Sequence, residues 1–479
     1  MILRKKHVKN LSMSWLPFAD AASEGLPLSQ LLRLSLFQVS VGMASVLLLG
    51  TLNRVMIVEL GVPASVVAIM IALPVLMAPL RAVLGFRSDN HRSALGWKRI
   101  PYLWFGSLWQ MGGLAVMPFA LIVLSGDQYL GPPWAGEMLA GIAFLMTGLG
   151  MSMVQTAGVA LAADRATEDT RPRVVALLYV MYLLGMAISS IIVGSLLRDF
   201  APLTLVRVVQ GCGLATLLLN LVALWKQEKF RPMTAEEIAA PRPKFSEAMA
   251  DLKSIPDAMR LMVVVAVGAL GFNMQDVLLE PYGGEILGLS VSVTTLLTAS
   301  SAMGALVGFW LAARWLGRGM DPFRMAARGP LIGIGALSAV VFSAPLGSTA
   351  LFFVGAAGIG LGGGIFSVAT LTAAMNLPET GLAGRGVVLG AWGAAQATAA
   401  GASVAIGGLL RDGIGHLALS GRLGQGLAVP STGYSFVYHF EIGLLFVTLA
   451  VLGPLVRTRI LTTQTEQGKA RFGLAEFPT

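Results

Sequence analysis

The chain has 479 residues, of which 55% are hydrophobic and only 12% charged, and its mean hydropathy is +0.75. Soluble domains carry about 25% charged residues, so this composition excludes an ordinary soluble protein and indicates that most of the chain lies in a membrane. The net charge is +9, which we attribute to membrane topology and to attraction for anionic lipid headgroups rather than to nucleic-acid binding. The single cysteine, Cys212, excludes a disulfide framework and a metal site built from cysteines.

The first 33 residues form a basic arm with a short aromatic and aliphatic patch at Trp15, Leu16 and Phe18 that could lie in the membrane interface. This arm lacks an apolar core followed by a cleavage site, so we expect no signal peptide. A membrane-spanning helix needs about 20 apolar residues. Six such runs follow the arm, near Leu34–Val58, Ala64–Leu84, Pro101–Leu124, Met138–Leu161, Val174–Leu197 and Leu203–Trp225.

The longest polar segment, residues 226–260, separates these runs from a second set of six. We therefore predict an all-α membrane protein of about twelve transmembrane helices. Its predicted parts are an arm (1–33), a first six-helix half (34–225), a cytoplasmic linker (226–260), a second half (261–457) and a cytoplasmic tail (458–479). The second set of runs lies near Met262–Leu279, Val291–Trp315, Gly329–Ala344, Ala350–Met375, Val387–Leu410 and Phe436–Val456.

Lysine and arginine predict the orientation, because short basic loops resist translocation across the membrane. With the N-terminus inside, 29 of the 34 basic residues fall in cytoplasmic segments. We therefore expect both termini to face the cytoplasm. The basic residues left outside are Arg54, Arg198, Arg207, Arg411 and Arg422.

The two halves repeat one another. LNRVM at residues 52–56 corresponds to MQDVL at 274–278, which aligns Asn53-Arg54 with Gln275-Asp276. Later in each half, GSLLRD at 194–199 corresponds to GGLLRD at 407–412. Such matches predict a duplicated six-helix unit with a pseudo-two-fold axis along the membrane normal, as in the parallel halves of major facilitator proteins.

The loop GFRSDNHRSALGWKRIPY resembles the loop of major facilitator transporters in which a glycine, an aspartate and basic residues follow the second helix. An aspartate at a helix end can hold a neighbouring helix N-terminus and basic side chains, so we predict a latch between helices on the cytoplasmic side. The alternative is a basic loop that only sets topology. The second copy has no acid at the place of Asp89. The predicted latch residues are Gly85, Asp89, Arg92, Lys98, Arg99, Asp164, Arg171, Arg173, Glu379 and Arg385.

Charged residues inside the apolar runs are costly, at about 2.5–3.5 kcal/mol near the bilayer centre, unless they are paired or face a cavity. Arg54 and Asp276 occupy matching repeat positions, so we expect them to pair as a gate or as an assembly specificity device. Asp276 and Glu280 are spaced i, i+4, which places them on one face of a helix. Alternatively Glu59, Glu280 and Glu285 lie at the water interface. The predicted polar cluster between the two halves comprises Asn53, Arg54, Gln275, Asp276, Glu280 and Tyr282.

Enzymatic signatures are missing from the sequence. It has no GxxxxGK[ST] phosphate-binding loop, no HExxH metal motif and no legible Ser/His/Asp arrangement. We therefore do not expect an enzyme, an intrinsic cofactor or a resident metal site. His439 is the best placed of the four histidines to act as an axial ligand to the magnesium of a tetrapyrrole. The alternative is an aromatic-belt position beside Tyr434, Phe436 and Tyr438.

Several segments resemble those of the PucC/LhaA family, the bacteriochlorophyll delivery branch of the major facilitator superfamily. They are LNRVMIVELGVPA, FRSDNHRSALGWKRIPYLW, RPRVVALLYVMYLLGM, MQDVLLEPYGGEILGLSVSVTTLLTA and NLPETGLAGRGVVLGAWGAAQ, and the likeness extends from about Leu34 to Val456. The arm with SWLPFAD is similar to the LhaA subgroup, which is associated with the core antenna LH1.

The resemblance implies a light-harvesting assembly factor in the inner or chromatophore membrane of a purple phototrophic bacterium. Its implied cargo is bacteriochlorophyll or a precursor. Its implied partners are the light-harvesting α and β apoproteins, bacteriochlorophyll synthase and other assembly proteins, with homo-oligomers also open. The alternative function is proton-coupled secondary transport of a small solute, with Asp276 or Glu280 as the proton carrier.

Overall fold

A computed structural model describes residues 26–76, 97, 99–125, 132, 134–167, 170–227, 257–316, 318–377 and 385–471. Within helices it does not describe the side chains of residues 171–173, 175, 385–387, 389, 390 and 457–471. In this part of the chain, eleven helices are long and apolar enough to cross a membrane, and Ala64–Leu76 is a shorter apolar helix. The prediction of an all-α membrane protein is confirmed.

The first apolar run forms one long helix in four pieces. They are the α-helix α2 (Leu28–Ser45), the π-helical turn η2 (Val46–Thr51), α3 (Leu52–Arg54) and the second π-helical turn η3 (Val55–Glu59). Single π-helical turns inside α-helices are rare and are frequent at functional sites. The next helices are α4 (Ala64–Leu76), α6 (Ile100–Leu124), α7 (Ala135–Arg165), α8 (Arg171–Leu196) and α9 (Pro202–Leu224).

The seventh apolar run is also interrupted. It contains α12 (Ala258–Asn273), the 3-10 turn η4 (Met274–Val277) and α13 (Leu279–Glu285). The later elements are α14 (Val291–Leu316), α15 (Pro322–Ser343), α16 (Thr349–Met375), α17 (Arg385–Leu419), the 3-10 turn η5 (Gln425–Leu427) and α18 (Ser431–Arg471).

Local sequence explains where several helices begin. Proline occupies one of the first two positions of α6, α8, α9 and α15, where its missing N–H removes no hydrogen bond from the helix. Asp321 caps α15 by accepting from the backbone N–H groups of Phe323 and Arg324, both at 3.0 Å. Ser348 caps α16 by accepting from Leu351 N–H at 3.2 Å.

The chain divides into two compact units that do not follow the boundary between the sequence halves. Unit 1 consists of residues 1–241, 275–303 and 404–434, and unit 2 of residues 242–274, 304–403 and 435–479. Parts of α14 and α17 therefore belong to each unit. The predicted domain boundaries at residues 225 and 261 stay a prediction.

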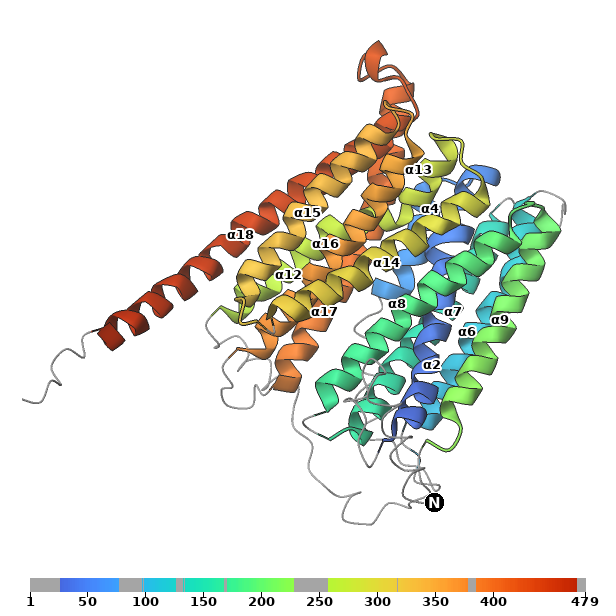
Figure 1. The fold of residues 1–479 in the computed structure, drawn as a ribbon. Coiled ribbons are helices and arrows are strands. Elements are labelled where there is room, and N and C mark those ends of the chain that lie inside the picture. The colour runs from blue at the N-terminus through green and yellow to red at the C-terminus, as the bar shows by residue number, and fades with distance from the viewer. Residues whose placement is uncertain are drawn as a thin grey trace, which may run out of the picture. The chain divides into compact units, whose positions relative to one another are not determined.

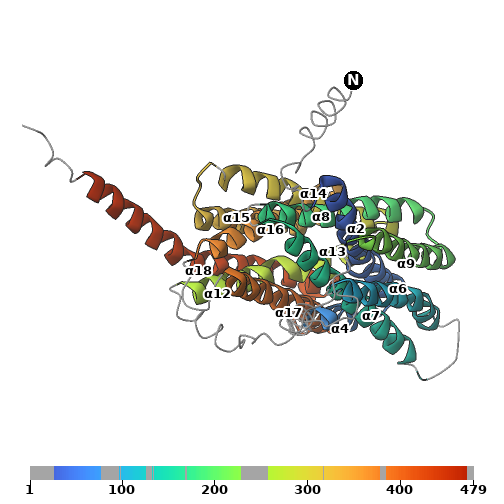
Figure 2. The ribbon, with the colours of Figure 1, turned by 90° about the horizontal axis from the view of Figure 1, so that it is seen from below.

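In unit 1, α6 packs along α7, and α2 packs against α7, α8 and α9. Figures 1 and 2 show α2 beside α8 and α9 from two directions. Small residues allow the close approach of α6 and α7: a Cβ built on Gly113 would lie 2.6 Å from the carbonyl oxygen of Ala143. Phe37, Leu103, Val154 and Leu178, from α2, α6, α7 and α8, belong to one buried apolar cluster.

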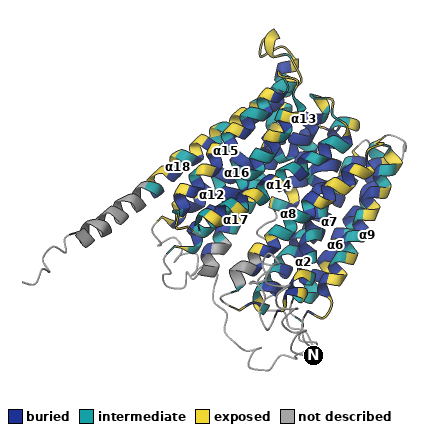
Figure 3. Cartoon of the chain, viewed as in Figure 1, coloured by how far each residue is buried: buried dark blue, intermediate teal, exposed yellow. Residues whose placement is uncertain are grey.

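In unit 2, α15 and α16 run together along their lengths (Figure 1). Gly329 and Gly362 face one another, and a Cβ on either would lie 2.7 Å from the carbonyl oxygen of the other. Figure 3 shows exposed positions along the outer faces of the helices. Many of these positions carry large apolar side chains, such as Phe342 and Val354, as expected for helices that contact lipid rather than water.

Candidate functional site

The interruption of the seventh apolar run creates a polar site in unit 1. Pro281 lies three residues into α13, and proline cannot donate the helical hydrogen bond to the residue four positions earlier, which here is Val277. The carbonyl of Val277 therefore lacks its helical donor. Asn53, buried on α3, donates to it through Nδ2 at 2.8 Å. This contact joins the first apolar run to the seventh.

Arg54, the next residue on α3, is 4% exposed and makes an ion pair and a hydrogen bond to a backbone carbonyl. Its Nη1 pairs with Oε1 of Glu59 at 2.5 Å, and its Nη2 donates to the backbone carbonyl of Leu289 at 3.1 Å. A Cβ on Gly284 would lie 3.0 Å from Nε and Nη2 of Arg54. The absence of a side chain at Gly284 therefore makes room for the guanidinium.

The expected pairing of Arg54 with Asp276 is wrong for this structure. Among the described residues, the ion-pair partner of Arg54 is Glu59, and Asp276 accepts from Nε2 of Gln275 at 2.6 Å. The reason is local: Glu59 follows Arg54 by five residues, and the π-helical turn η3 between them has i to i+5 hydrogen bonding. The side chain of Glu59 is 39% exposed, and its predicted alternative position at the water interface stays a prediction.

Glu280 and Asp276 have different hydrogen-bond partners, and the interruption of the helix falls between them. Glu280 is 3% exposed and is therefore enclosed by the protein. Its Oε1 accepts from Thr298 Oγ1 at 2.6 Å, while its Oε2 is buried with no hydrogen-bond partner among the described residues. Gly50, on η2, leaves the space that the carboxyl fills: a Cβ there would lie 3.0 Å from Cδ of Glu280. The i, i+4 spacing therefore does not place the two acids in one environment.

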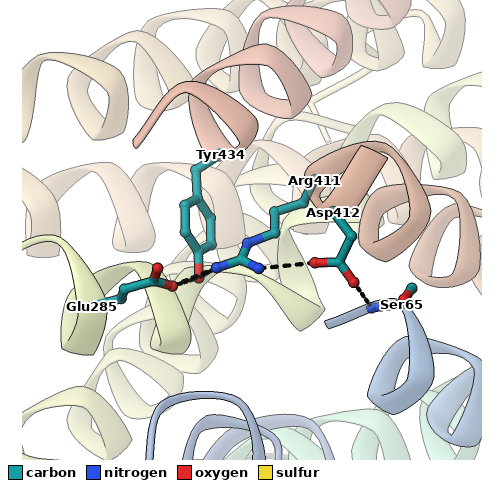
Figure 4. Close-up of polar contacts among 5 residues, drawn as sticks. All are labelled: Ser65, Glu285, Arg411, Asp412 and Tyr434. Atoms are coloured by element: carbon teal, nitrogen blue, oxygen red, sulfur yellow. Dashed lines mark hydrogen bonds and ion pairs between the residues drawn. The ribbon is translucent and has the colours of Figure 1, made fainter. Parts of the chain in front are cut away.

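A second network lies further along α13 and includes residues that sequence reasoning did not combine (Figure 4). Arg411 on α17 donates to Oε2 of Glu285 at 2.5 Å and to Oδ1 of Asp412 at 2.8 Å. The hydroxyl of Tyr434 also donates to Glu285, at 2.7 Å, and the Arg411 guanidinium lies 4.6 Å from the centroid of the Tyr434 ring. Tyr282, a predicted site residue, is buried with its ring 5.4 Å from that of Tyr434.

Asp412 connects this network to the start of α4. Its Oδ2 accepts from the backbone N–H of Ser65 at 2.6 Å, so a residue of α17 caps the N-terminus of α4. One turn earlier, a Cβ on Gly408 would lie 2.8 Å from the carbonyl oxygen of Ala64. Asp412 is the last residue of the GGLLRD copy of the repeat.

The predicted latch is described in part. Arg99 Nε lies 3.1 Å from Oδ2 of Asp164, which joins the start of α6 to the end of α7. Next to Asp164, Arg165 donates to Gln227 Oε1 at 2.7 Å and to Gln30 Oε1 at 3.0 Å. Gly85, Asp89, Arg92, Lys98 and Glu379 lie outside the described residues, and the side chains of Arg171, Arg173 and Arg385 are not described.

Two polar residues of α18, Glu441 and His439, lie in unit 2. Glu441 is fully buried within the apolar run of α18, and sequence reasoning overlooked it. His439 is exposed on the same helix and its Nδ1 lies 2.7 Å from the carbonyl oxygen of Ser435. No cluster of three or more His, Cys, Asp or Glu residues that could hold a metal ion occurs in the described part of the chain.

Comparison with known proteins places this arrangement in a family. The family model for PUCC proteins matches residues 51–460. The chain belongs to the PUCC protein family. It is 66% identical over 480 residues, covering all of both chains, to an uncharacterized protein in the puhA-bchM intergenic region of Rhodobacter capsulatus. It is also 53% identical over 405 residues to protein PucC of Rhodovulum sulfidophilum, covering 84% of this chain and 88% of that one.

Solved transporter structures share the fold of this PUCC-family chain. An inward-facing bacterial homologue of the human lysosomal transporter Spinster matches with a TM-score of 0.67 and 14% identity, covering 90% of this chain and 97% of that one. The predicted major facilitator fold is confirmed. The chain is a multi-pass membrane protein, and at this level of identity the likeness to transporters concerns the fold alone.

Proposed function

We propose that this protein is a light-harvesting assembly factor that binds bacteriochlorophyll or a precursor and delivers it to antenna apoproteins of LH1 in the chromatophore membrane. The observation that carries the proposal is membership of the PUCC family over residues 51–460. In this proposal the protein is not an enzyme and has no intrinsic cofactor. The pigment is its cargo, and the α and β apoproteins and bacteriochlorophyll synthase are its partners.

The physical properties of the chain support this role. Bacteriochlorophyll has a hydrocarbon tail and partitions into lipid, so its carrier needs apolar, membrane-facing surface with a few polar groups that orient the macrocycle. The exposed helix faces are rich in large apolar side chains. Polar side chains such as Asn53, Arg54 and Glu280 are instead committed to the interrupted helices of unit 1.

The test combines a spectrum with a strain phenotype. The protein purified in mild detergent should show a far-red tetrapyrrole band. A deletion strain should synthesise pigment but build the core antenna slowly, and Asp276→Asn or Arg54→Ala should reproduce that defect. Asp199→Asn, at the end of the first GSLLRD copy, serves as the matched control. A deletion strain that builds a normal core antenna at the normal rate would refute the proposal.

Proton-coupled transport of a small solute is the second candidate. The observation that favours it is Glu280, a buried carboxyl with one oxygen unpartnered among the described residues, in a fold shared with transporters. A membrane-embedded carboxyl of this kind is a site for a proton carrier. A colourless purified protein that catalyses proton-driven uptake in proteoliposomes, with the uptake abolished by Glu280→Gln, would establish it instead.

A further inference from the structure

One exposed face of α18 carries a histidine between two phenylalanines. Phe436 and Phe440 are each 42% exposed, and His439, which precedes Phe440, is also exposed. Their spacing of i, i+3 and i+4 places all three on one side of the helix. The two phenyl rings are nearly parallel, with an interplanar angle of 7° and centroids 6.5 Å apart. The face is therefore apolar except for one imidazole.

The hydrogen bond of His439 fixes the tautomer of its ring. Nδ1 lies 2.7 Å from the carbonyl oxygen of Ser435, one turn earlier on α18. A carbonyl oxygen only accepts, so Nδ1 carries the proton and donates. In the neutral imidazole, Nε2 then holds a lone pair, and no contact between Nε2 and the described residues is recorded. A backbone carbonyl that holds Nδ1–H is also the usual support for a histidine whose other nitrogen binds a metal.

The depth of His439 makes an unpartnered Nε2 unfavourable. His439 is the ninth residue of the apolar span Ser431–Val456, which places it about 12 Å along a helix that rises 1.5 Å per residue. The 26-residue span is about 39 Å long, against a hydrocarbon core of about 30 Å. A span centred on the core would place His439 inside it, where water is not available to Nε2.

The chemistry of the site selects the class of ligand. The lone pair of Nε2 does not bind a ketone or quinone oxygen, because such an oxygen needs a hydrogen-bond donor. A free metal ion needs several protein ligands, and no such cluster occurs in the described part of the chain. A metal that already has four ligands in the plane of a macrocycle needs one axial nitrogen, and the flanking rings of Phe436 and Phe440 suit a flat apolar ring system.

We propose that Nε2 of His439 is the axial ligand to the magnesium of a bacteriochlorophyll-type tetrapyrrole that docks on the Phe436–Phe440 face of α18. The proposal rests on the proposed function, because it takes the pigment to be the cargo. It adds the place where the cargo binds and the group that recognises its metal. The backbone carbonyl of Ser435 is then a positioning group that keeps the lone pair directed outward.

The test compares pigment binding by the full chain and by His439→Leu. Both proteins are purified without pigment and titrated with bacteriochlorophyll in detergent, and binding is followed by the far-red absorption band. Resonance Raman marker bands report whether magnesium has gained an axial ligand. His439→Leu should weaken binding by about tenfold or more and lose the ligation marker. Because the His439 side chain is exposed, the thermal unfolding temperature of the His439→Leu protein should match that of the wild type.

Three further measurements separate ligation from general packing. His416→Leu, which removes an exposed histidine of α17, should bind as the wild type does. The same macrocycle without magnesium should bind the wild type and His439→Leu equally. Imidazole added to His439→Gly should restore the ligation marker.

The outcomes also distinguish the two proposals. If the wild type binds the pigment and His439→Leu binds it equally well with an unchanged marker, the inference about His439 is overturned and the proposed function stands. If the wild type binds no tetrapyrrole at all, both fall.

Discussion

Pro281 and Asn53 are far apart in sequence, but Asn53 supplies the hydrogen-bond donor that Pro281 lacks. Proline at position 281 removes the helical donor from the Val277 carbonyl, and Asn53 Nδ2 replaces it at 2.8 Å. Leaving a buried carbonyl without a donor costs about 1–3 kcal/mol. Asn53→Ala should therefore lower the free energy of unfolding by about that amount, measured by denaturant unfolding in detergent.

Asn273 provides a control of the same residue type for Asn53→Ala. Its Nδ2 donates to the Ala269 carbonyl on its own helix, at 2.6 Å. The Ala269 carbonyl lies within the α-helix α12. Asn273→Ala should therefore lower the free energy of unfolding by less than Asn53→Ala does. Equal costs for the two substitutions would contradict the role assigned to Asn53.

Gly50 is the second residue whose chemistry can be tested alone. A Cβ at this position would lie 3.0 Å from Cδ of Glu280 and 3.1 Å from Oγ1 of Thr298. Neither neighbour is free to move away, because the two are hydrogen bonded to each other at 2.6 Å. Gly50→Ala should destabilise the protein by about 1–3 kcal/mol, and the cost should shrink in a Glu280→Ala background.

Gly211 on α9 is the matched glycine for that comparison. A Cβ there would meet nothing within 4 Å, and alanine is the better helix former by about 1 kcal/mol. Gly211→Ala should leave the unfolding temperature unchanged or raise it. If Gly50→Ala proved equally harmless, the fit between Gly50 and the Glu280 carboxyl would not constrain the fold.

At the scale of the element, Asp412 shows a helix cap supplied by a different helix. Its Oδ2 accepts from the Ser65 N–H at 2.6 Å, and loss of such a cap costs about 0.5–2 kcal/mol. Asp412→Ala should accelerate amide hydrogen exchange in the first turn of α4. Asp321→Ala removes a cap that α15 receives from its own N-cap residue, so it should accelerate exchange at the start of α15 and leave α4 protected. Unchanged exchange at Ser65 in Asp412→Ala would contradict the capping role.

The same element shows what the repeat could predict. GSLLRD and GGLLRD were recognised as copies, and both bring a glycine against the first turn of another helix. A Cβ on Gly194 would lie 3.1 Å from the Ser292 carbonyl oxygen, as one on Gly408 would lie 2.8 Å from that of Ala64. The repeat predicted that the two segments are equivalent, while their contacts and partner helices were not predictable, because these depend on tertiary packing.

The polar site shows where sequence reasoning stops. Asn53, Arg54 and Glu280 were found because polar residues in apolar runs are costly. The pairing of Arg54 with Asp276 was wrong because it assumed regular helices, whereas the first run contains π-helical turns and the seventh a 3-10 turn. Irregular turns change the direction of the side chains that follow them by part of a helical turn. The local sequence LNRVM does not predict such turns.

At the scale of the whole molecule, the hydropathy runs predicted the helices closely, since burial in lipid imposes both length and composition. The run Ala350–Met375, for example, corresponds to α16 at Thr349–Met375. The boundaries of the two compact units could not be predicted from the hydropathy runs. They divide α14 near residue 303 and α17 near residue 403, so each unit combines segments that are distant in the sequence.

The membrane topology of the whole chain depends on whether α4 crosses the membrane. Twelve crossings return the chain to its starting side, whereas eleven leave the termini on opposite sides. The described part of α4, Ala64–Leu76, has 13 residues and is about 20 Å long, less than a hydrocarbon core of about 30 Å. The apolar run itself extends to Leu84, and if it did not cross, the basic residues that follow it would lie on the external side, against the positive-inside rule. We therefore expect twelve crossings and both termini in the cytoplasm.

Paired reporter fusions one helix apart test this topology directly. Alkaline phosphatase, which is active only outside the cytoplasm, should be active when fused after Leu423, between α17 and α18, and inactive after Thr479. A fluorescent protein that folds only in the cytoplasm should give the reverse pattern. Active phosphatase at Thr479 together with inactive phosphatase at Leu423 would mean eleven crossings when the N-terminus is inside. The Arg411 network would then face the cytoplasm, and the assignment of 29 of the 34 basic residues to cytoplasmic segments would no longer hold.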